Sequence, residues 1–231
     1  MKQVVLVAHG SPSEPEPQEA ALQALVARLG ALCPGDEIRG ATLASPGALA
    51  RALDGLERPL IYPFFMAEGW FTRREMPRRI AELGVEVRYL RPLGLEPGLP
   101  DLIARDCLAG AKTAGIEPNS SDLILVGHGS KVARKSKDTT YAMAETLRRR
   151  LPFWRVRVAL IEEPPFLVDI ARESPGGVCL PFFALRAGHV AEDIPQALAE
   201  AGFDGVLLDP IGAHPGTAEL IAAAIARAEA P

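Results

Sequence analysis

Residues 180–195 read LPFFALRAGHVAEDIP, and this stretch decides the fold that we expect for the whole chain. The apolar run at 178–183 predicts a buried strand, and the pattern after it, with Glu192 and Asp193, predicts a helix. His189 lies in the turn between them. Open α/β sheets bind their ligands at the carboxyl ends of their strands, so His189 is the first candidate for a functional residue.

Two other predicted strands are followed by polar side chains in the same way. The apolar run at 123–126 ends in Gly-His-Gly-Ser, which contains His128, and the run at 156–161 is followed by Glu162 and Glu163. If these strands are parallel, all of these side chains emerge at one edge of the sheet. Imidazole and carboxylate together are either a ligand set for a borderline divalent metal or a general base with an orienting acid.

Strand-like and helix-like segments alternate along the chain, which predicts an α/β fold with parallel sheets. In the first half we expect strands at 4–8, 37–43, 60–65 and 85–90, and helices at 18–32, 47–56, 72–83 and 100–114. A polar stretch at 115–121 is typical of a linker, and four more strands are expected after it. We therefore predict two similar half-domains, 1–115 and 122–231, each a doubly wound, four-stranded parallel sheet flanked by helices.

The two halves repeat one another at the level of single residues. The segments VAHGS at 7–11 and VGHGS at 126–130 match, as do PFF at 63–65 and at 181–183, and PLG at 92–94 and PIG at 210–212. Shared residues at nearly constant spacing are stronger evidence than shared periodicity, and they indicate a duplicated and fused half-domain.

The differences between the two copies indicate where the working site lies. The polar positions of the second half and their counterparts in the first are His189 with Trp70 or Phe71, Glu162 and Glu163 with Ala44 and Ser45, and His214 with Glu96. Among these polar positions, the first copy keeps only the histidine after its first strand, His9, which corresponds to His128. We therefore expect the site in the second half, and Trp70 and Phe71 are candidates for an apolar wall against a flat ligand.

Composition excludes several classes of protein. The net charge of −4 argues against general binding to nucleic acid or to anionic membranes. No segment approaches the ~20 apolar residues of a membrane span, and the beginning of the chain is typical of a strand and not of a signal peptide. The three cysteines are odd in number and far apart, which predicts reduced thiols in a cytoplasmic protein.

Taken in order, these motifs resemble the class II tetrapyrrole chelatases, and specifically the sirohydrochlorin cobaltochelatases and ferrochelatases with two fused half-domains. The resemblance covers nearly the whole chain. It implies that Co²⁺ or Fe²⁺ is inserted into sirohydrochlorin in cobalamin or sirohaem biosynthesis. It also implies that His128 and His189 bind the metal and that Glu162 or Glu163 assists, with strand alternation slightly favouring Glu162. His9 lacks a second histidine, so it is not assigned to the metal.

Sirohydrochlorin is a polycarboxylate, so its site requires positive charge. Ser130 and Lys131 in the loop after His128, together with Arg186, are the candidates to bind it. The loop continues with further basic residues, namely Arg134, Lys135 and Lys137, and the alternative for all of them is a solvated loop. His214 and Glu192 are secondary candidates, because a hydrogen bond at a helix start and the favourable helix dipole also account for them.

The sequence contains no Gly-x-x-x-x-Gly-Lys phosphate-binding motif, so we expect neither ATP nor an organic cofactor. The main alternative function is a carrier of metal or tetrapyrrole that has the same fold but no turnover. A metal-assisted hydrolase using the same histidines is a third hypothesis. The ligand types accept several divalent metals, and a monomer and a homodimer are both compatible with the sequence.

Overall fold

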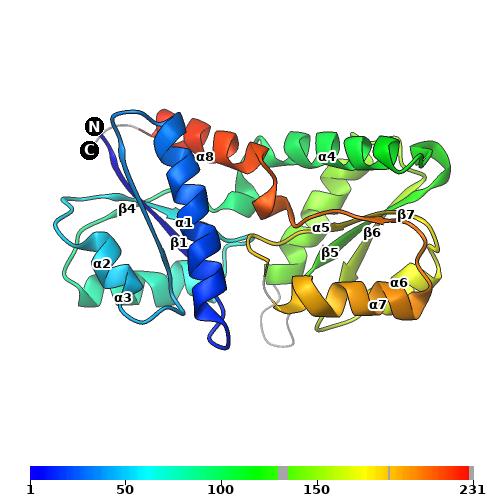
Figure 1. Cartoon of the computed structure of the whole chain (residues 1–231), viewed down its shortest axis with the longest axis horizontal. Helices are drawn as coiled ribbons and strands as arrows, with labels where there is room; N and C mark the ends of the chain where they lie inside the picture. Colours follow the sequence, from blue (N-terminus) through cyan, green and yellow to red (C-terminus); the bar gives the residue numbers. More distant parts are fainter. Residues whose placement is uncertain (130–134, 187, 229–231) are drawn as a thin grey trace. The chain divides into compact units, whose positions relative to one another are not determined.

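The structure is a computed structural model of the chain (Figure 1). It describes residues 1–129, 135–186 and 188–228, apart from the side chains of residues 135, 136 and 189. Its contacts divide the chain into two compact units, which we describe separately. Unit 1 comprises residues 1–96 and 215–231, and unit 2 comprises residues 97–214.

Unit 1 contains one four-stranded parallel sheet and its helices. In chain order the elements are β1 (Gln3–Ala8), α1 (Pro15–Leu32), β2 (Glu37–Thr42), α2 (Ala48–Leu53), β3 (Leu60–Pro63), η1 (Phe71–Glu75), α3 (Met76–Glu82), β4 (Arg88–Tyr89), η2 (Leu93–Leu95) and α8 (Gly216–Arg227). The strand order is β2-β1-β3-β4. The chain moves outward from β1 in both directions, as in a doubly wound sheet.

Unit 2 repeats this arrangement. Its elements are α4 (Leu99–Thr113), η3 (Pro118–Ser120), β5 (Asp122–Gly127), α5 (Lys135–Arg148), β6 (Arg155–Leu160), α6 (Leu167–Arg172), β7 (Gly177–Pro181), η4 (His189–Asp193), α7 (Ile194–Ala201), β8 (Val206–Leu207) and η5 (Ile211–Ala213). The strand order is β6-β5-β7-β8, again all parallel. The prediction of two parallel four-stranded sheets flanked by helices is therefore confirmed.

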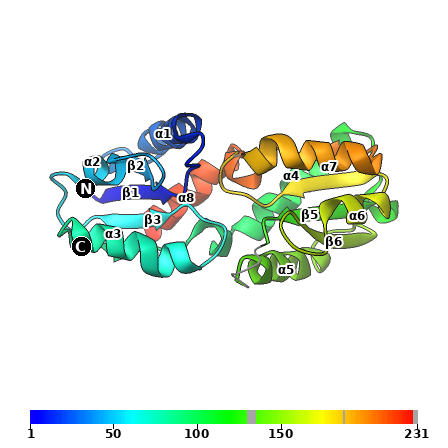
Figure 2. The same cartoon turned by 90° about the horizontal axis from the view of Figure 1, so that it is seen from below.

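Helices cover both faces of each sheet. In unit 1, α2 and α3 pack on the face that presents Val5, Val7 and Ile61, and α1 and α8 pack together on the other face. Figure 2 shows α1 and α3 on opposite sides of β1 and β3. The central strands β1, β3, β5 and β7 are buried on both faces, which explains why they are mainly apolar runs without polar alternation.

Two expected elements differ from the structure. Only Arg88 and Tyr89 of the expected strand 85–90 pair with β3, while Val85 and Val87 pack against the core without joining the ladder. The expected helix 72–83 is divided into the π-helix η1 and the α-helix α3. Pro77 has no N–H to continue the α-helical ladder, and Met76 before it donates to Phe71 O, five residues back.

The first copy of the repeat ends in helix α4 and the second copy ends in helix α8. Each of these helices packs in the unit that is formed mainly by the other copy. Helix α8 lies beside α1 in unit 1 (red and blue in Figure 1), where Lys2 Nζ donates to Ile225 O at 2.6 Å. Helix α4 packs in unit 2 against β7 and α5. The compact units therefore differ from the consecutive halves 1–115 and 122–231, because the apolar face of each last helix is buried on the sheet of the other unit.

The outer edges of both sheets are capped by a side chain from a neighbouring helix. On β6, Arg148 donates through Nε and Nη2 to Val156 O at 3.0 and 2.8 Å, and on β2 Gln23 donates to Gly40 O at 2.9 Å. An open groove of 560 Å³ lies beside this edge of β6, between Tyr141 and Pro165. Capping the free carbonyls of an edge strand limits pairing with another chain.

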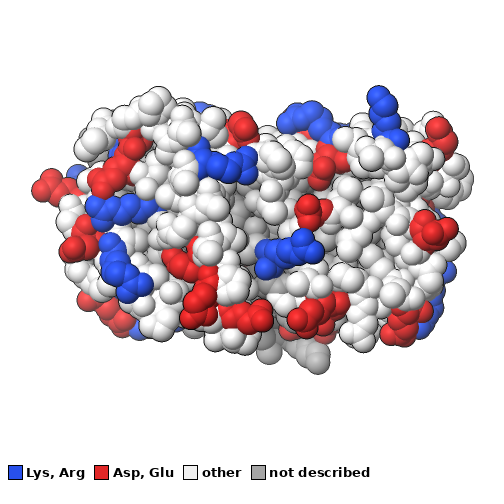
Figure 3. Space-filling view, viewed as in Figure 1, with Lys and Arg blue, Asp and Glu red and all other residues white. Residues whose placement is uncertain are grey.

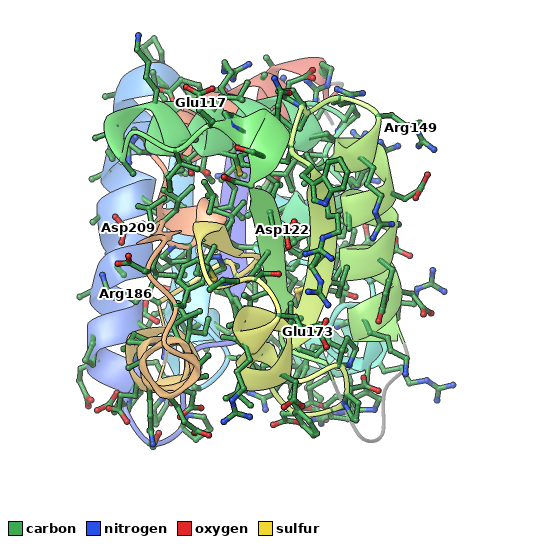
Figure 4. The ribbon with its side chains drawn as sticks, turned by 90° about the vertical axis from the view of Figure 1, so that its right-hand side faces the viewer. Glu117, Asp122, Arg149, Glu173, Arg186 and Asp209 are labelled. Carbon is green, nitrogen blue, oxygen red and sulfur yellow. The ribbon has the colours of Figure 1, made fainter. Side chains whose placement is uncertain are left out.

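A buried carboxylate anchors the amino end of the second sheet. Asp122 accepts hydrogen bonds from Arg155 Nε at 3.0 Å and Nη2 at 2.7 Å, and from Ser174 Oγ at 2.5 Å. In Figure 4, which labels Asp122 and Glu173, the carboxylate lies at the start of the strand. The three cysteines are free thiols, two of them buried, and no helix in the described part of the chain is long and apolar enough to cross a membrane.

Candidate functional site

His128 follows β5 directly, at the carboxyl edge of the second sheet. Its Nδ1 lies 2.9 Å from Gly129 O, and Gly129 has a φ of +72°, which favours glycine. A carbonyl oxygen only accepts hydrogen bonds, so Nδ1 carries the hydrogen in this contact. A backbone partner that orients a histidine in this way is typical of metal-binding imidazoles.

Glu162 and Glu163 have different surroundings. Glu162 N donates to His128 O at 3.0 Å, and the Glu162 carboxylate, 39% exposed, lies with Oε1 4.0 Å from His128 Nε2. Glu163 is more buried, and its carboxylate accepts from Lys137 Nζ of α5 at 2.7 Å. Within this turn, Glu162 is therefore the carboxylate beside the imidazole, whereas Glu163 forms an ion pair with Lys137 of α5.

An apolar ring borders the imidazole. Phe183, just after β7, lies with its ring centroid 6.2 Å from that of His128. Strands β5 and β7 are direct neighbours, with Val126 opposite Pro181, so their carboxyl ends meet as predicted from the parallel arrangement. The site thus has a polar side formed by Glu162 and an apolar side formed by Phe183.

The backbone of His189 begins the π-helix η4, but its side chain lies outside the described part of the structure, as do Ser130 and Lys131 altogether. The first copy provides the comparison. Phe71 begins η1, which has the same length and the same position after its strand, and the Phe71 ring contacts the His9 ring at a centroid distance of 4.1 Å. In unit 1 the first residue of this π-helix thus reaches the histidine that follows the first strand.

The other predicted site residues have partners of their own. Arg186 forms an exposed ion pair with Asp209 at 3.3 Å, and Figure 4 shows the two side chains together. His214 Nε2 lies 3.6 Å from Asp106 Oδ1 of α4. Glu192 and Asp193 are exposed, and Figure 3 shows acidic side chains over the beginning of α7. Among the described residues, no group of three or more His, Cys, Asp and Glu side chains converges on a possible metal position.

Two contacts could not be inferred from the sequence. Lys137 was grouped with the basic residues of the loop after His128, yet its ammonium group is paired with Glu163. No sequence motif indicates Asp106 as a site residue, because it contacts His214 only when α4 packs in unit 2. In both contacts the two residues are far apart in the sequence, and no sequence motif predicts contacts of this kind.

Comparison with known proteins identifies the family. The CbiX family model matches residues 3–108 and again residues 122–228, once for each copy of the repeat. The chain belongs to the CbiX family. The predicted resemblance to sirohydrochlorin chelatases is thereby confirmed.

Individual relatives agree with this assignment. A probable sirohydrochlorin cobaltochelatase of Halobacterium salinarum is 25% identical, over 85% of this chain and 76% of the relative. The structure of CbiX described as the terminal enzyme for biosynthesis of siroheme in denitrifying bacteria is 42% identical, with a TM-score of 0.90 over 99% of this chain and 100% of that one. SirB from Bacillus subtilis with Fe³⁺ shares the fold at 18% identity, with a TM-score of 0.78 over 98% and 95%.

Proposed function

We propose that this member of the CbiX family inserts a divalent metal ion, Co²⁺ or Fe²⁺, into sirohydrochlorin. The observation that carries the proposal is the family match over both copies of the repeat. It is supported by the full-length similarity to the CbiX structure from siroheme biosynthesis. The metal ion is a substrate in this reaction, and the proposal includes neither ATP nor an organic cofactor.

We assign the metal to His128 and His189. The argument for His189 rests on the internal repeat, because its counterpart Phe71 contacts the ring of His9. The pairing of the strands is equivalent in the two units, with Val7 opposite Pro63 and Val126 opposite Pro181. By analogy with Phe71, we expect the residue at the start of η4 to serve the histidine that follows β5, and two imidazoles can share one ion.

The proposed chemistry follows from these ligands. Two imidazoles leave several coordination positions of the ion open, which suits a site that must release its metal to the pyrrole nitrogens. Two pyrrole protons must also leave, and a neutral imidazole accepts a proton near neutral pH. Glu162, 4.0 Å from His128 Nε2, stabilises the imidazolium that forms or takes the proton onward to solvent.

Binding of the tetrapyrrole is assigned to Ser130, Lys131 and Arg186. The ion pair between Arg186 and Asp209 has side chains 62% and 76% exposed, and such surface pairs contribute little stability. Arg186 can therefore exchange Asp209 for a carboxylate of the substrate at small cost.

Metallation assays test this function directly. Purified protein is mixed with sirohydrochlorin and with each divalent metal, anaerobically for iron, and the absorbance change of metallation is followed. We expect activity to be lost in His128→Ala and His189→Ala and retained in His9→Ala, which removes the equivalent residue of the first copy. Tetrapyrrole binding without metallation by the parent protein would instead support a carrier, and full activity of His189→Ala would refute the site.

A further inference from the structure

The chain passes between the two units at two equivalent places. It leaves unit 1 between Glu96 and Pro97 and returns to it between His214 and Pro215. The surrounding segments, PLGLEPG at 92–98 and PIGAHPG at 210–216, are copies of each other. Glu96 and His214 are therefore the last residues of their units before each crossing, and each follows a short 3₁₀ turn, η2 or η5.

Both residues lie beside a side chain of the helix that arrives from the other copy, with the acid and the base exchanged between the two contacts. In unit 1 the acid is on the connecting segment, and Glu96 Oε2 accepts from Arg227 Nη2 of α8 at 2.9 Å. In unit 2 the base is on the connecting segment, and His214 Nε2 lies 3.6 Å from Asp106 Oδ1 of α4. The residues on the connecting segments, Glu96 and His214, are at equivalent positions, and the acid and the base are exchanged between the two pairs. Their partners on the helices, Arg227 and Asp106, lie one helical turn apart in the repeat.

Burial makes the pair in unit 1 costly to break. The side chain of Glu96 is 3% exposed. Burial raises the pKa of this carboxyl, and Arg227 and Arg91 oppose the rise. A buried carboxylate that loses a hydrogen-bonded cation is destabilised, so a positive charge on the docked helix favours unit 1.

The buried faces of α4 and α8 are similar but not identical, because Leu99 and Cys107 of α4 correspond to Thr217 and Ile225 of α8. Ile103 and Ile221 are equivalent and fully buried. The charged positions differ, because Asp106 corresponds to Ala224 and Arg227 corresponds to Ala109. If each helix packed on the unit begun by its own copy, Glu96 would face Asp106 without Arg227, and His214 would lose its acidic partner.

We propose that these two ion pairs select which helix completes which unit. The docking surface of unit 1 is specific for a helix that carries a cation, and the docking surface of unit 2 is specific for a helix that carries an acid. The reversed polarity then enforces the exchange of α4 and α8, and it disfavours the arrangement in which each helix packs with its own copy. This proposal is independent of the metal-insertion function.

Three full-length variants test the selection. The first reverses the connecting segments (Glu96→Lys with His214→Glu), the second reverses the helices (Asp106→Lys with Arg227→Glu), and the third combines all four changes. In each double variant the exchanged helices would pair opposite charges again, but one helical turn out of register. We therefore expect each double variant to melt up to roughly 5 °C lower than the parent and the combined variant to recover most of this loss. Additive losses in the combined variant would overturn the proposal.

A photo-crosslink identifies the helix that is docked. Lys2 contacts α8 at Ile225, so benzoylphenylalanine at position 2 should crosslink to α8 in the parent and in the combined variant. In the variant with reversed connecting segments we expect crosslinks to α4 near Cys107, the equivalent of Ile225. Crosslinks that stay on α8 in that variant would refute selection. If that variant does not fold, a double-mutant cycle with Glu96→Gln and Arg227→Gln measures the coupling free energy between these two residues. The absence of measurable coupling would also refute the proposal.

Discussion

Lys137 Nζ lies 2.7 Å from Glu163 Oε2, and this ion pair connects the first turns of α5 to the segment that carries Glu162. The same segment is held on its other side by the hydrogen bond from Glu162 N to His128 O. Glu163 is 15% exposed, so the pair is partly shielded from solvent. We infer that Lys137 positions Glu162 relative to the imidazole of His128.

Lys137→Ala is therefore expected to lower kcat for metallation by about tenfold with little change in the KM for sirohydrochlorin, as is usual when a residue that orients a metal site is lost. Lys137→Arg should preserve the ion pair and most of the rate. Steady-state metallation kinetics separate the two constants. A raised KM with unchanged kcat would show instead that Lys137 binds the carboxylates of the substrate, as its place in the basic loop suggests.

Gly212 and Gly94 provide a matched pair of substitutions. A Cβ at Gly212 would lie 1.9 Å from Ala184 O, and a Cβ at Gly94 would lie 1.7 Å from Met66 O. Both Gly→Ala variants should therefore displace the segment after the third strand of their unit and lower the melting temperature to a similar extent.

Only Gly212→Ala should also lower metallation, by up to about 10²-fold, because the displaced segment runs from Phe183 to the start of η4. Melting temperatures and metallation rates are measured on the same preparations. Equal loss of activity in Gly94→Ala and Gly212→Ala would contradict the placement of the site in unit 2.

Glu75 makes the stability of unit 1 dependent on pH. Hydrogen bonds from Arg78 and Arg79 lower its pKa from 4.5 to about 2. A lowered pKa in the folded state gives stability that is complete above pH 4.5 and is lost as the pH falls toward 2. Glu75→Gln should thus melt below the parent at neutral pH, and the difference should shrink through that interval.

Calorimetry across this pH range checks the prediction. The control is Glu86→Gln, because Glu86 is 83% exposed and its ion pair with Arg58 is long, at 3.5 Å. Glu86→Gln should match the parent at each pH. A difference between Glu75→Gln and the parent that does not vary with pH would rule out the linkage.

Arg148 protects the outer edge of the second sheet. Removing its guanidinium in Arg148→Ala leaves Val156 O without this donor, and we expect a loss of about 1–2 kcal/mol in the free energy of unfolding, with more aggregation on heating. Arg149→Ala is the matched control, because Arg149 is 68% exposed and pairs with Glu145 at the surface. Denaturant unfolding and light scattering compare the two variants. Identical behaviour would show that the cap has no role.

Much of the fold follows from local patterns. Each central strand is an apolar run that is buried on both faces, as at Val4–Ala8 and Leu123–Val126, and such runs are visible in the sequence. The expected strand at 85–90 was too long because Val85 and Val87 are apolar for packing and not for pairing. Hydrophobicity reports burial, and it carries little information on which backbone groups pair at a sheet edge.

For the candidate site, the sequence placed His128 and the two glutamates after adjacent strands, and the structure agrees with that placement. It favoured Glu162 over Glu163 only slightly, because both follow β6 and have the same chemistry. The distinction arises from Lys137, which lies 26 residues earlier and meets Glu163 only after α5 has packed on the sheet. The functional assignment of all these residues, namely His128, His189, Glu162, Glu163, Ser130, Lys131 and Arg186, stays a prediction.

By itself, the sequence determined the duplicated architecture, the parallel sheets and the family, because periodicity, repeated motifs and strand-end residues are local properties. Only the tertiary structure decided that α8 completes unit 1 and α4 completes unit 2. Both helices have an apolar face, and an apolar face specifies that it must be buried without specifying the surface that buries it. That choice depends on contacts between residues far apart in the chain, such as Glu96 with Arg227 and Asp106 with His214.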